Sequence, residues 1–151
     1  MYSADSIAML ETDEPGLGSR GVDTLTMSVT GNAIAQARHR VRRVNTSRLV
    51  FYDPHQREKV SFRLAVKESL QDVGIQYFPV FRNVHVRVHV SFFVRNLNKD
   101  LDNMIKFVLD ALQSVVYRND LCVVEMHSAK FLTAEPHDTT HIVVSSNLLR
   151  N

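Results

Sequence analysis

Several features that often reveal the class of a protein are scarce or missing from this sequence. Cysteine occurs once, as Cys122, so no disulfide can form within the chain, which fits a reducing compartment. No run of about 18 apolar residues occurs, which excludes a membrane-spanning helix. The first residues lack the basic segment and apolar core of a secretory signal peptide. We therefore expect a protein that works inside the cell, without contact with a membrane.

The length and the charge distribution of the chain indicate one folded domain with a basic surface. The 151 residues can build one ordinary hydrophobic core. The formal net charge of +2 combines −4 over residues 1–23 with +6 over the remainder. Residues 1–22 are acidic and show no sustained periodicity, so we expect a flexible acidic extension there and a single domain over residues 23–151. A basic domain favours a polyanionic partner.

Hydrophobic periodicity predicts an α/β fold. Alternating apolar residues indicate four strands, and apolar residues three and four apart indicate two helices, the second beginning at or just after Asp102. The strands are expected over residues 25–29, 84–94, 121–129 and 141–145, and the first helix over residues 53–72. Within that helix we expect Val60 and Leu64 to face the core and Lys59 to face solvent. The order is strand, basic loop, helix, strand, helix, strand, strand, and we expect a mixed sheet flanked by the two helices.

The strongest candidate site lies in residues 99–120, where three carboxylates surround the second predicted helix. If Asp100 precedes that helix in extended backbone, its side chain and that of Asp102 can face one spot, and a helix returning to a strand can bring Asp120 near them. Gathered carboxylates bind hard cations such as Mg²⁺, which suits phosphodiester hydrolysis by metal-activated water. Lys106, one turn beyond Asp102, could offset the charge of the transition state.

The same residues also have an ordinary structural interpretation. Asp100 could be a helix N-cap, and Asp102 a first-turn acid favoured by the helix dipole. Asp102 and Lys106 could form a simple pair of opposite charges four residues apart. The spacing of these residues does not by itself distinguish this interpretation from a metal site.

A cluster of arginines follows the first predicted strand, in residues 34–48. Phosphates would relieve the repulsion among these guanidiniums, although a solvated basic loop is an equally simple explanation. Lys99 and Lys130 are further candidates for phosphate contact. The arginines expected to bind DNA are Arg38, Arg40, Arg42, Arg43 and Arg48.

Histidines on the predicted strands offer only a weak signal for a metal. His85 and His89 are four residues apart, a spacing that does not bring two side chains together on a strand, so we interpret them as sheet-face histidines rather than a zinc pair. Glu125 and His127 could support a nearby metal site or could be ordinary polar residues of a strand.

The acidic segment resembles the signature of the RusA-type Holliday junction resolvases. It reads Asp100-Leu101-Asp102-Asn103, then Lys106, Asp110-Ala111-Leu112, Tyr117 and Asn119-Asp120, and the weaker likeness extends over residues 25–144. The resemblance implies that Asp100, Asp102 and Asp120 hold a divalent metal and that Lys106 assists catalysis. It further implies a homodimer that acts on four-way DNA junctions. Two features depart from the family pattern: Asn119 replaces the first acid of the pair, and the basic loop lacks a proline.

Together these observations predict a Mg²⁺-dependent, structure-selective endonuclease that resolves Holliday junctions or other branched DNA, with Mn²⁺ able to replace Mg²⁺. We expect no organic cofactor, and a cytoplasmic or nucleoid-associated location. A catalytically inactive protein that binds branched DNA is the alternative, favoured by Asn119. A nucleotide-sugar transferase with a DxD motif ranks last, because the chain is short and lacks a glycine-rich phosphate loop.

Overall fold

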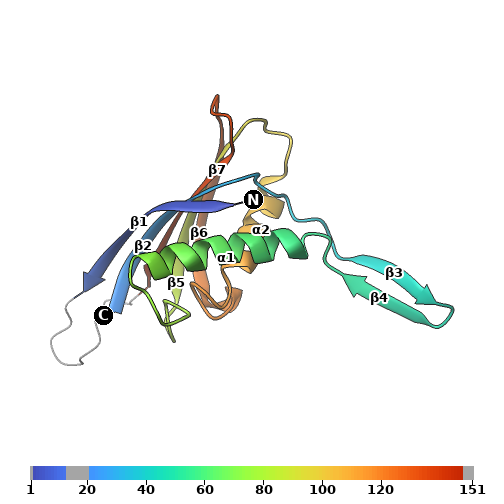
Figure 1. Ribbon diagram of the computed structural model, residues 1–151, viewed down its shortest axis with the longest axis horizontal. Coiled ribbons are helices and arrows are strands. Elements are labelled where there is room, and N and C mark those ends of the chain that lie inside the picture. The colour runs from blue at the N-terminus through green and yellow to red at the C-terminus, as the bar shows by residue number, and fades with distance from the viewer. Residues whose placement is uncertain (1, 13–20, 148–151) are drawn as a thin grey trace.

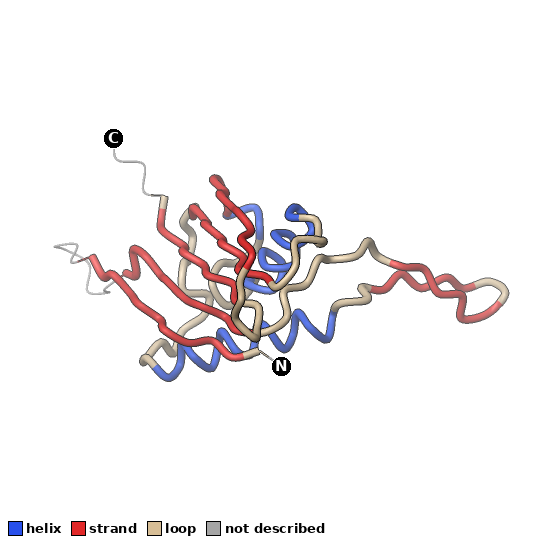
Figure 2. The backbone as a smooth tube through the Cα atoms, turned by 90° about the horizontal axis from the view of Figure 1, so that it is seen from above, coloured by secondary structure: helices blue, strands red, loops and turns tan. Residues whose placement is uncertain are grey.

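The computed structural model describes residues 2–12 and 21–147, which form a two-layer α/β body with a long projecting hairpin (Figures 1 and 2). No helix in this described part of the chain is long and apolar enough to cross a membrane. The strands are β1 (Ser3–Thr12), β2 (Gly21–Thr30), β3 (Arg40–Asn45), β4 (Arg48–Tyr52), β5 (Val86–Val94), β6 (Val123–Leu132) and β7 (Thr139–Ser146). The helices are α1 (Gln56–Asp72), α2 (Leu101–Leu112) and the short 3₁₀ helix η1 (Asp120–Cys122).

The main sheet of the described chain has five strands in the order β1-β2-β7-β5-β6. Neighbouring strands are antiparallel except β5 and β6, which run parallel. Parallel neighbours need a crossover, and α2 supplies it between β5 and β6. The expected mixed sheet with two main helices is confirmed.

The core lies between one face of the sheet and both helices. Along β5 the residues alternate between buried and exposed, as predicted from the sequence, and Val88 and Val90 pair in register with Val144 and Ile142 of β7. From the helices, Phe62 of α1 meets Phe107 of α2 edge to face, with ring centroids 5.8 Å apart. Both helices therefore cover the same face of the sheet and leave the other face open to solvent.

The N-terminal segment differs from the predicted flexible extension. Residues 3–12 form edge strand β1, which pairs antiparallel with β2, whereas residues 13–20 lie outside the described residues. Tyr2 anchors the start of this strand: its hydroxyl donates to the carbonyl of Asn32 at 2.8 Å, and its ring packs edge-on against Phe62. This segment shows no sustained periodicity, so the sequence did not indicate the strand. The proposed domain boundary at residue 23 stays a prediction.

The arginine-rich segment is also more ordered than predicted. Instead of an irregular loop, β3 and β4 pair into an antiparallel hairpin that extends away from the body (Figures 1 and 2). At its tip the side-chain oxygen of Asn45 accepts a hydrogen bond from the Ser47 N–H at 3.0 Å, a local turn that reverses the chain. Every residue of β3 is exposed.

Helix α1 ends where expected, before Gly74 in the left-handed conformation (φ 95°), but it begins at Gln56 and turns a different face to the core. Val60 and Leu64, expected to be inward, are exposed, whereas Lys59, expected to be outward, is 5% exposed. Lys59 is buried because it meets two carboxylates. Periodicity alone could not reveal that partnership.

Candidate active site

At the entry to α2, Asp100 precedes the helix, as its convergence with Asp102 requires, but the helix begins at Leu101, one residue before the predicted start. Asp100 lies just before the helix in extended backbone (φ −68°, ψ 128°), and Asp102 lies in the first turn. The carboxylate of Asp100 accepts no hydrogen bond from the backbone N–H groups of α2, so it is not a side-chain cap. Its contact is with the amide of Asn103, at 3.4 Å. Both aspartates are exposed, which leaves their oxygens available to a cation.

Two lysines hold the loop that precedes Asp100 in place through hydrogen bonds. The ammonium of Lys130 donates to the carbonyls of Leu97 and Lys99, at 2.8 and 2.6 Å. The ammonium of Lys99 donates to the side-chain oxygen of Asn32, at 3.2 Å, and to the carbonyl of Ala33. The predicted contact of these lysines with DNA stays a prediction, because in this structure both ammonium groups hold the backbone beside the acidic signature.

Asp138 is a supporting residue that the sequence interpretation missed. Its carboxylate, 5% exposed, accepts hydrogen bonds from the backbone N–H groups of Ala33 and Arg95, at 3.1 and 3.0 Å. It thereby joins the turn between β6 and β7 to the segments that follow β2 and β5. Its position just after Pro136-His137 is typical of a turn and does not suggest a buried role. That a buried carboxylate joins distant segments can be recognised only once its partners in the fold are known.

One root of the hairpin is bonded to the acidic signature. The backbone N–H of Gln36, which leads into β3, donates to the carbonyl of Asn103 at 3.0 Å. Asn103 belongs to the first turn of α2, directly after Asp102. The five arginines predicted to bind DNA lie on this approach and on the hairpin itself, and all five are exposed. The basic surface therefore begins beside the two aspartates.

The other root of the hairpin is an ion-pair cluster. The ammonium of Lys59 lies 2.5 Å from the carboxylate of Asp53, just after β4, and 3.2 Å from that of Asp110 on α2. Burial alone would raise the pKa of Asp53, but hydrogen bonds from Lys59 and the His55 N–H, with the charge of Lys59, lower it below its ordinary range. Both strands of the hairpin are thus tied to α2.

Asp120 lies at the other end of α2 from Asp100 and Asp102. Because β5 and β6 are parallel, Val123 pairs with Val86 at the amino end of β5, whereas Asp100 follows the carboxyl end. The 12 residues of α2 between these ends span about 18 Å. The prediction that all three carboxylates converge within one chain is therefore wrong. The role of each as a metal ligand stays a prediction.

The segment around Asp120 is nevertheless held by side-chain hydrogen bonds. The buried hydroxyl of Tyr117 donates to the carbonyl of Leu109 at 2.8 Å. Burial, and then the charges of Asp110 and Asp120, raise the pKa of this tyrosine far above its usual range. The side-chain oxygen of Asn119 accepts from the Leu121 N–H at 3.1 Å and so caps η1. Asp120 itself stays exposed beside it. An asparagine can perform this capping as well as an aspartate.

A different group of metal-type side chains does come together among the described residues. Ligand atoms of His89, Glu125 and His127 all lie within 4.8 Å of one another. The sequence interpretation missed this group because it compared His89 with His85 along one strand. The partner of His89 is His127 on the neighbouring strand, and the parallel register that joins them is not visible in the sequence.

Comparisons with known proteins agree with the signature at α2. The search of curated proteins finds no match for this chain. Residues 30–144 match the family described as endodeoxyribonuclease RusA, and this range includes the arginine hairpin, both helices and all three aspartates. The match covers most of the chain and confirms the likeness first noted at Asp100 and Asp102. The chain therefore belongs to the RusA family of endodeoxyribonucleases, the Holliday junction resolvases.

Proposed function

We propose that this protein is a Mg²⁺-dependent, structure-selective endonuclease that resolves Holliday junctions or other branched DNA by paired nicks, in recombination and repair. The observation that carries the proposal is that the two aspartates at the start of α2 lie next to the base of the arginine hairpin. The exposed carboxylates of Asp100 and Asp102 lie beside the Gln36–Asn103 hydrogen bond that ties the base of the arginine hairpin to α2. The enzyme would act in the cytoplasm or at the nucleoid, where its substrate forms.

The donor set at the start of α2 fits a hard divalent cation. Asp100 and Asp102 supply carboxylate oxygens, the ligands that Mg²⁺ and Mn²⁺ prefer. When bound, the ion would neutralise phosphate charge and activate a water molecule for hydrolysis. Lys106 is exposed one turn beyond Asp102 and can place its ammonium near the same phosphate, where it would stabilise developing negative charge.

A second copy of the chain would complete the site. Asp120 is too far along α2 to join Asp100 and Asp102 of its own chain, but two-fold symmetry can bring Asp120 of another copy to them. Each site of the homodimer would then take two carboxylates from one copy and one from the other. Two sites related by symmetry suit paired nicks on strands of the same polarity.

The hairpin is the element proposed to hold the DNA. Its exposed guanidiniums can bind phosphates and release counterions, a contact that depends on backbone shape more than on base sequence. Two hairpins in a dimer could hold two arms of a junction, which would explain selectivity for branched DNA over duplex. We therefore expect recognition by junction geometry, with any base preference added at the step of cleavage.

The direct test uses a labelled synthetic four-way junction, with and without Mg²⁺, beside a linear duplex of matched sequence. We expect paired nicks in the junction when Mg²⁺ or Mn²⁺ is present, and little cutting of the duplex. Binding of the junction without cutting under any of these conditions would favour the alternative, a catalytically inactive protein that binds branched DNA. Asn119 is the residue that favours this alternative, although its capping of η1 leaves Asp120 exposed.

The composite site is tested by mixing inactive chains. Asp102→Asn and Asp120→Asn chains should each fail to cut, but their mixed dimer would contain one intact site and should regain nicking. The matched control mixes Asp100→Asn with Asp102→Asn, whose mixed dimer has no intact site. Recovery in neither mixture would contradict a site shared between two copies while leaving the single-chain tests of cleavage unaffected.

A further inference from the structure

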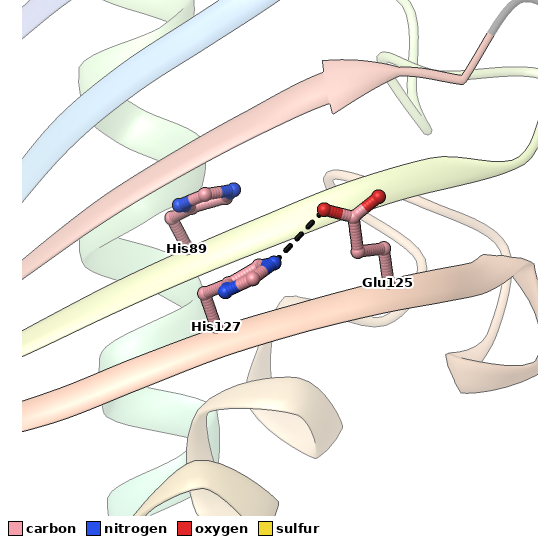
Figure 3. Close-up of side chains that lie close together, drawn as sticks. All are labelled: His89, Glu125 and His127. Carbon is pink, nitrogen blue, oxygen red and sulfur yellow. Dashed lines mark hydrogen bonds and ion pairs between the residues drawn. The ribbon is translucent and has the colours of Figure 1, made fainter.

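The solvent-facing side of the sheet carries a compact group of nitrogen and oxygen ligands (Figure 3). Alternate residues of a strand share a face, so Glu125 and His127 of β6 point the same way. The parallel register places His89 of β5 directly beside His127. Two ligands two residues apart on one strand and a third on its neighbour converge without any distortion of the backbone.

The side chain of His127 already contacts both of the others. The rings of His89 and His127 stack with centroids 4.6 Å apart and an angle of 23° between their planes. The Nε2 atom of His127 lies 2.9 Å from Oε1 of Glu125, as the dashed line in Figure 3 marks. The second carboxylate oxygen, Oε2, is 3.1 Å from the guanidinium of Arg87.

We propose that His89, Glu125 and His127 bind a Zn²⁺ ion on the outer face of the sheet. This site does not depend on the proposed nuclease activity, since it shares no residue with the carboxylates at α2. Two imidazoles and one carboxylate suit a borderline ion such as Zn²⁺, whereas Mg²⁺ prefers oxygen ligands alone. Three protein ligands leave the fourth position of a tetrahedral site to water.

Small side-chain rotations would form the site. Zn²⁺ lies about 2.1 Å from each ligand atom, so atoms now within 4.8 Å must draw slightly closer. The histidines are exposed and their ring torsions are soft, so each ring can turn its lone pair toward a common point. The ion would take the place of the His127–Glu125 contact. Arg87 could keep its hold on Oε2 and orient the carboxylate from outside, as partners of metal ligands commonly do.

Binding would stabilise the edge of the sheet. Strand β6 is the last strand in the described sheet and pairs on one side only, with β5. An ion held by residues of both strands would cross-link them. Since Zn²⁺ would bind this arrangement in the folded state, it should raise the thermal unfolding temperature by mass action.

The test is calorimetric titration of the full chain with Zn²⁺, supported by the visible absorption of Co²⁺ as a probe of tetrahedral geometry. We expect one Zn²⁺ per chain and at least a tenfold loss of affinity in His127→Ala and in His89→Gln. His85→Ala is the matched control, an exposed histidine just before β5 and outside the cluster, and should bind as the unaltered chain does. Asp102→Asn should also leave Zn²⁺ binding intact.

Three results would overturn the proposal. The first is no binding of Zn²⁺, and the second is equal affinity in the unaltered chain and both cluster variants. The third is a loss of Zn²⁺ binding in Asp102→Asn but not in His127→Ala, which would place the ion at the aspartates. Circular dichroism verifies that the variants fold, and a rise in unfolding temperature with Zn²⁺ in the unaltered chain but not in His89→Gln supports the site independently.

Discussion

The β3–β4 hairpin and the five-stranded sheet are both antiparallel for most of their length, but their side chains face different surroundings. Strand β5 alternates strictly: its valines and Phe92 are turned to the core, whereas Arg87, His89, Ser91 and Phe93 are turned to solvent. Strand β3 has no buried residue, and Val41 and Phe51, paired across the hairpin, are 49% and 72% exposed. The sheet is held by its core, whereas the hairpin has none.

An isolated two-stranded hairpin is marginally stable in water, so this one depends on its roots. Those roots are the Gln36–Asn103 hydrogen bond and the cluster of Lys59 with Asp53 and Asp110. Exposed arginines mixed with exposed apolar side chains suit a surface made for contact with a partner. In the proposed enzyme the body carries out catalysis, the hairpin binds the DNA, and α2 holds the two in place, and each of these roles can be tested separately.

The largest effect is expected on junction cleavage, from a substitution at the start of α2. Asp102→Asn should reduce junction cleavage about 1,000-fold, in the upper range seen when one charge-stabilising group of an active site is removed. Binding of the junction should be retained or tightened, because the loss of a negative charge eases the approach of phosphate. Cleavage of the labelled junction under single-turnover conditions and a binding titration measure the two quantities. A joint loss of binding and folding would instead support a purely structural role for this aspartate.

The second-largest effect is expected on the stability of the fold, from a substitution of Lys59 at the base of the hairpin. Lys59→Met should lower the free energy of unfolding by about 3 kcal/mol, the lower end for breaking a buried ion pair, since Asp110 is partly exposed. Urea unfolding followed by circular dichroism measures the change. Lys67→Met on the same helix is the matched control: its ammonium lies over the ring of Phe78, and it should lose less than about 1 kcal/mol. Equal losses in both variants would contradict the special role of Lys59.

A smaller effect is expected at the approach to the hairpin. Replacing Arg38 and Arg40 with alanine should weaken binding of junction and duplex alike, roughly tenfold at physiological salt, and lower the salt dependence by about 2 in slope. The cleavage rate at saturating enzyme should change little, because chemistry belongs to the body. Arg82→Ala, an exposed arginine at the opposite end of the sheet, is the control. Unchanged affinity in the double variant would exclude this segment from DNA binding.

The fold was largely predictable because its core strands and helices carry strong periodicity. The alternation over β5 and the apolar stripe of α2 each depend on one buried face, and a buried face repeats in the sequence. The hairpin escaped prediction because no residue of β3 or β4 is buried, and β1 because its segment shows no sustained periodicity. The predicted orientation of α1 was wrong because Lys59, although charged, is buried against Asp53 and Asp110. These partners lie 6 and 51 residues away in the chain.

The local backbone of the candidate site was predictable from the sequence, whereas the distances that depend on the pairing of β5 with β6 were not. Convergence of Asp100 and Asp102 requires extended backbone at Asp100, and the structure has it there, although α2 begins one residue earlier than predicted. The distance to Asp120 depends on the parallel pairing of β5 and β6, and that pairing also creates the group of His89, Glu125 and His127. No spacing within one segment encodes which strands are neighbours.

The smallest expected effect is the pH dependence of the hairpin root. The pKa of Asp53 is lowered from its ordinary value of 3.8 in the folded protein, so the unfolded state binds a proton first as the pH falls. The stability that Asp53 contributes is therefore complete above pH 3.8 and declines below it, toward the lower pKa of the folded state. In urea unfolding across this range, the difference between the unaltered chain and Asp53→Asn should shrink as the pH falls below 3.8. A difference that stays constant would mean that the charge of Asp53 is not what ties β4 to α2, and the hydrogen bond from the His55 N–H would then be the contact that matters.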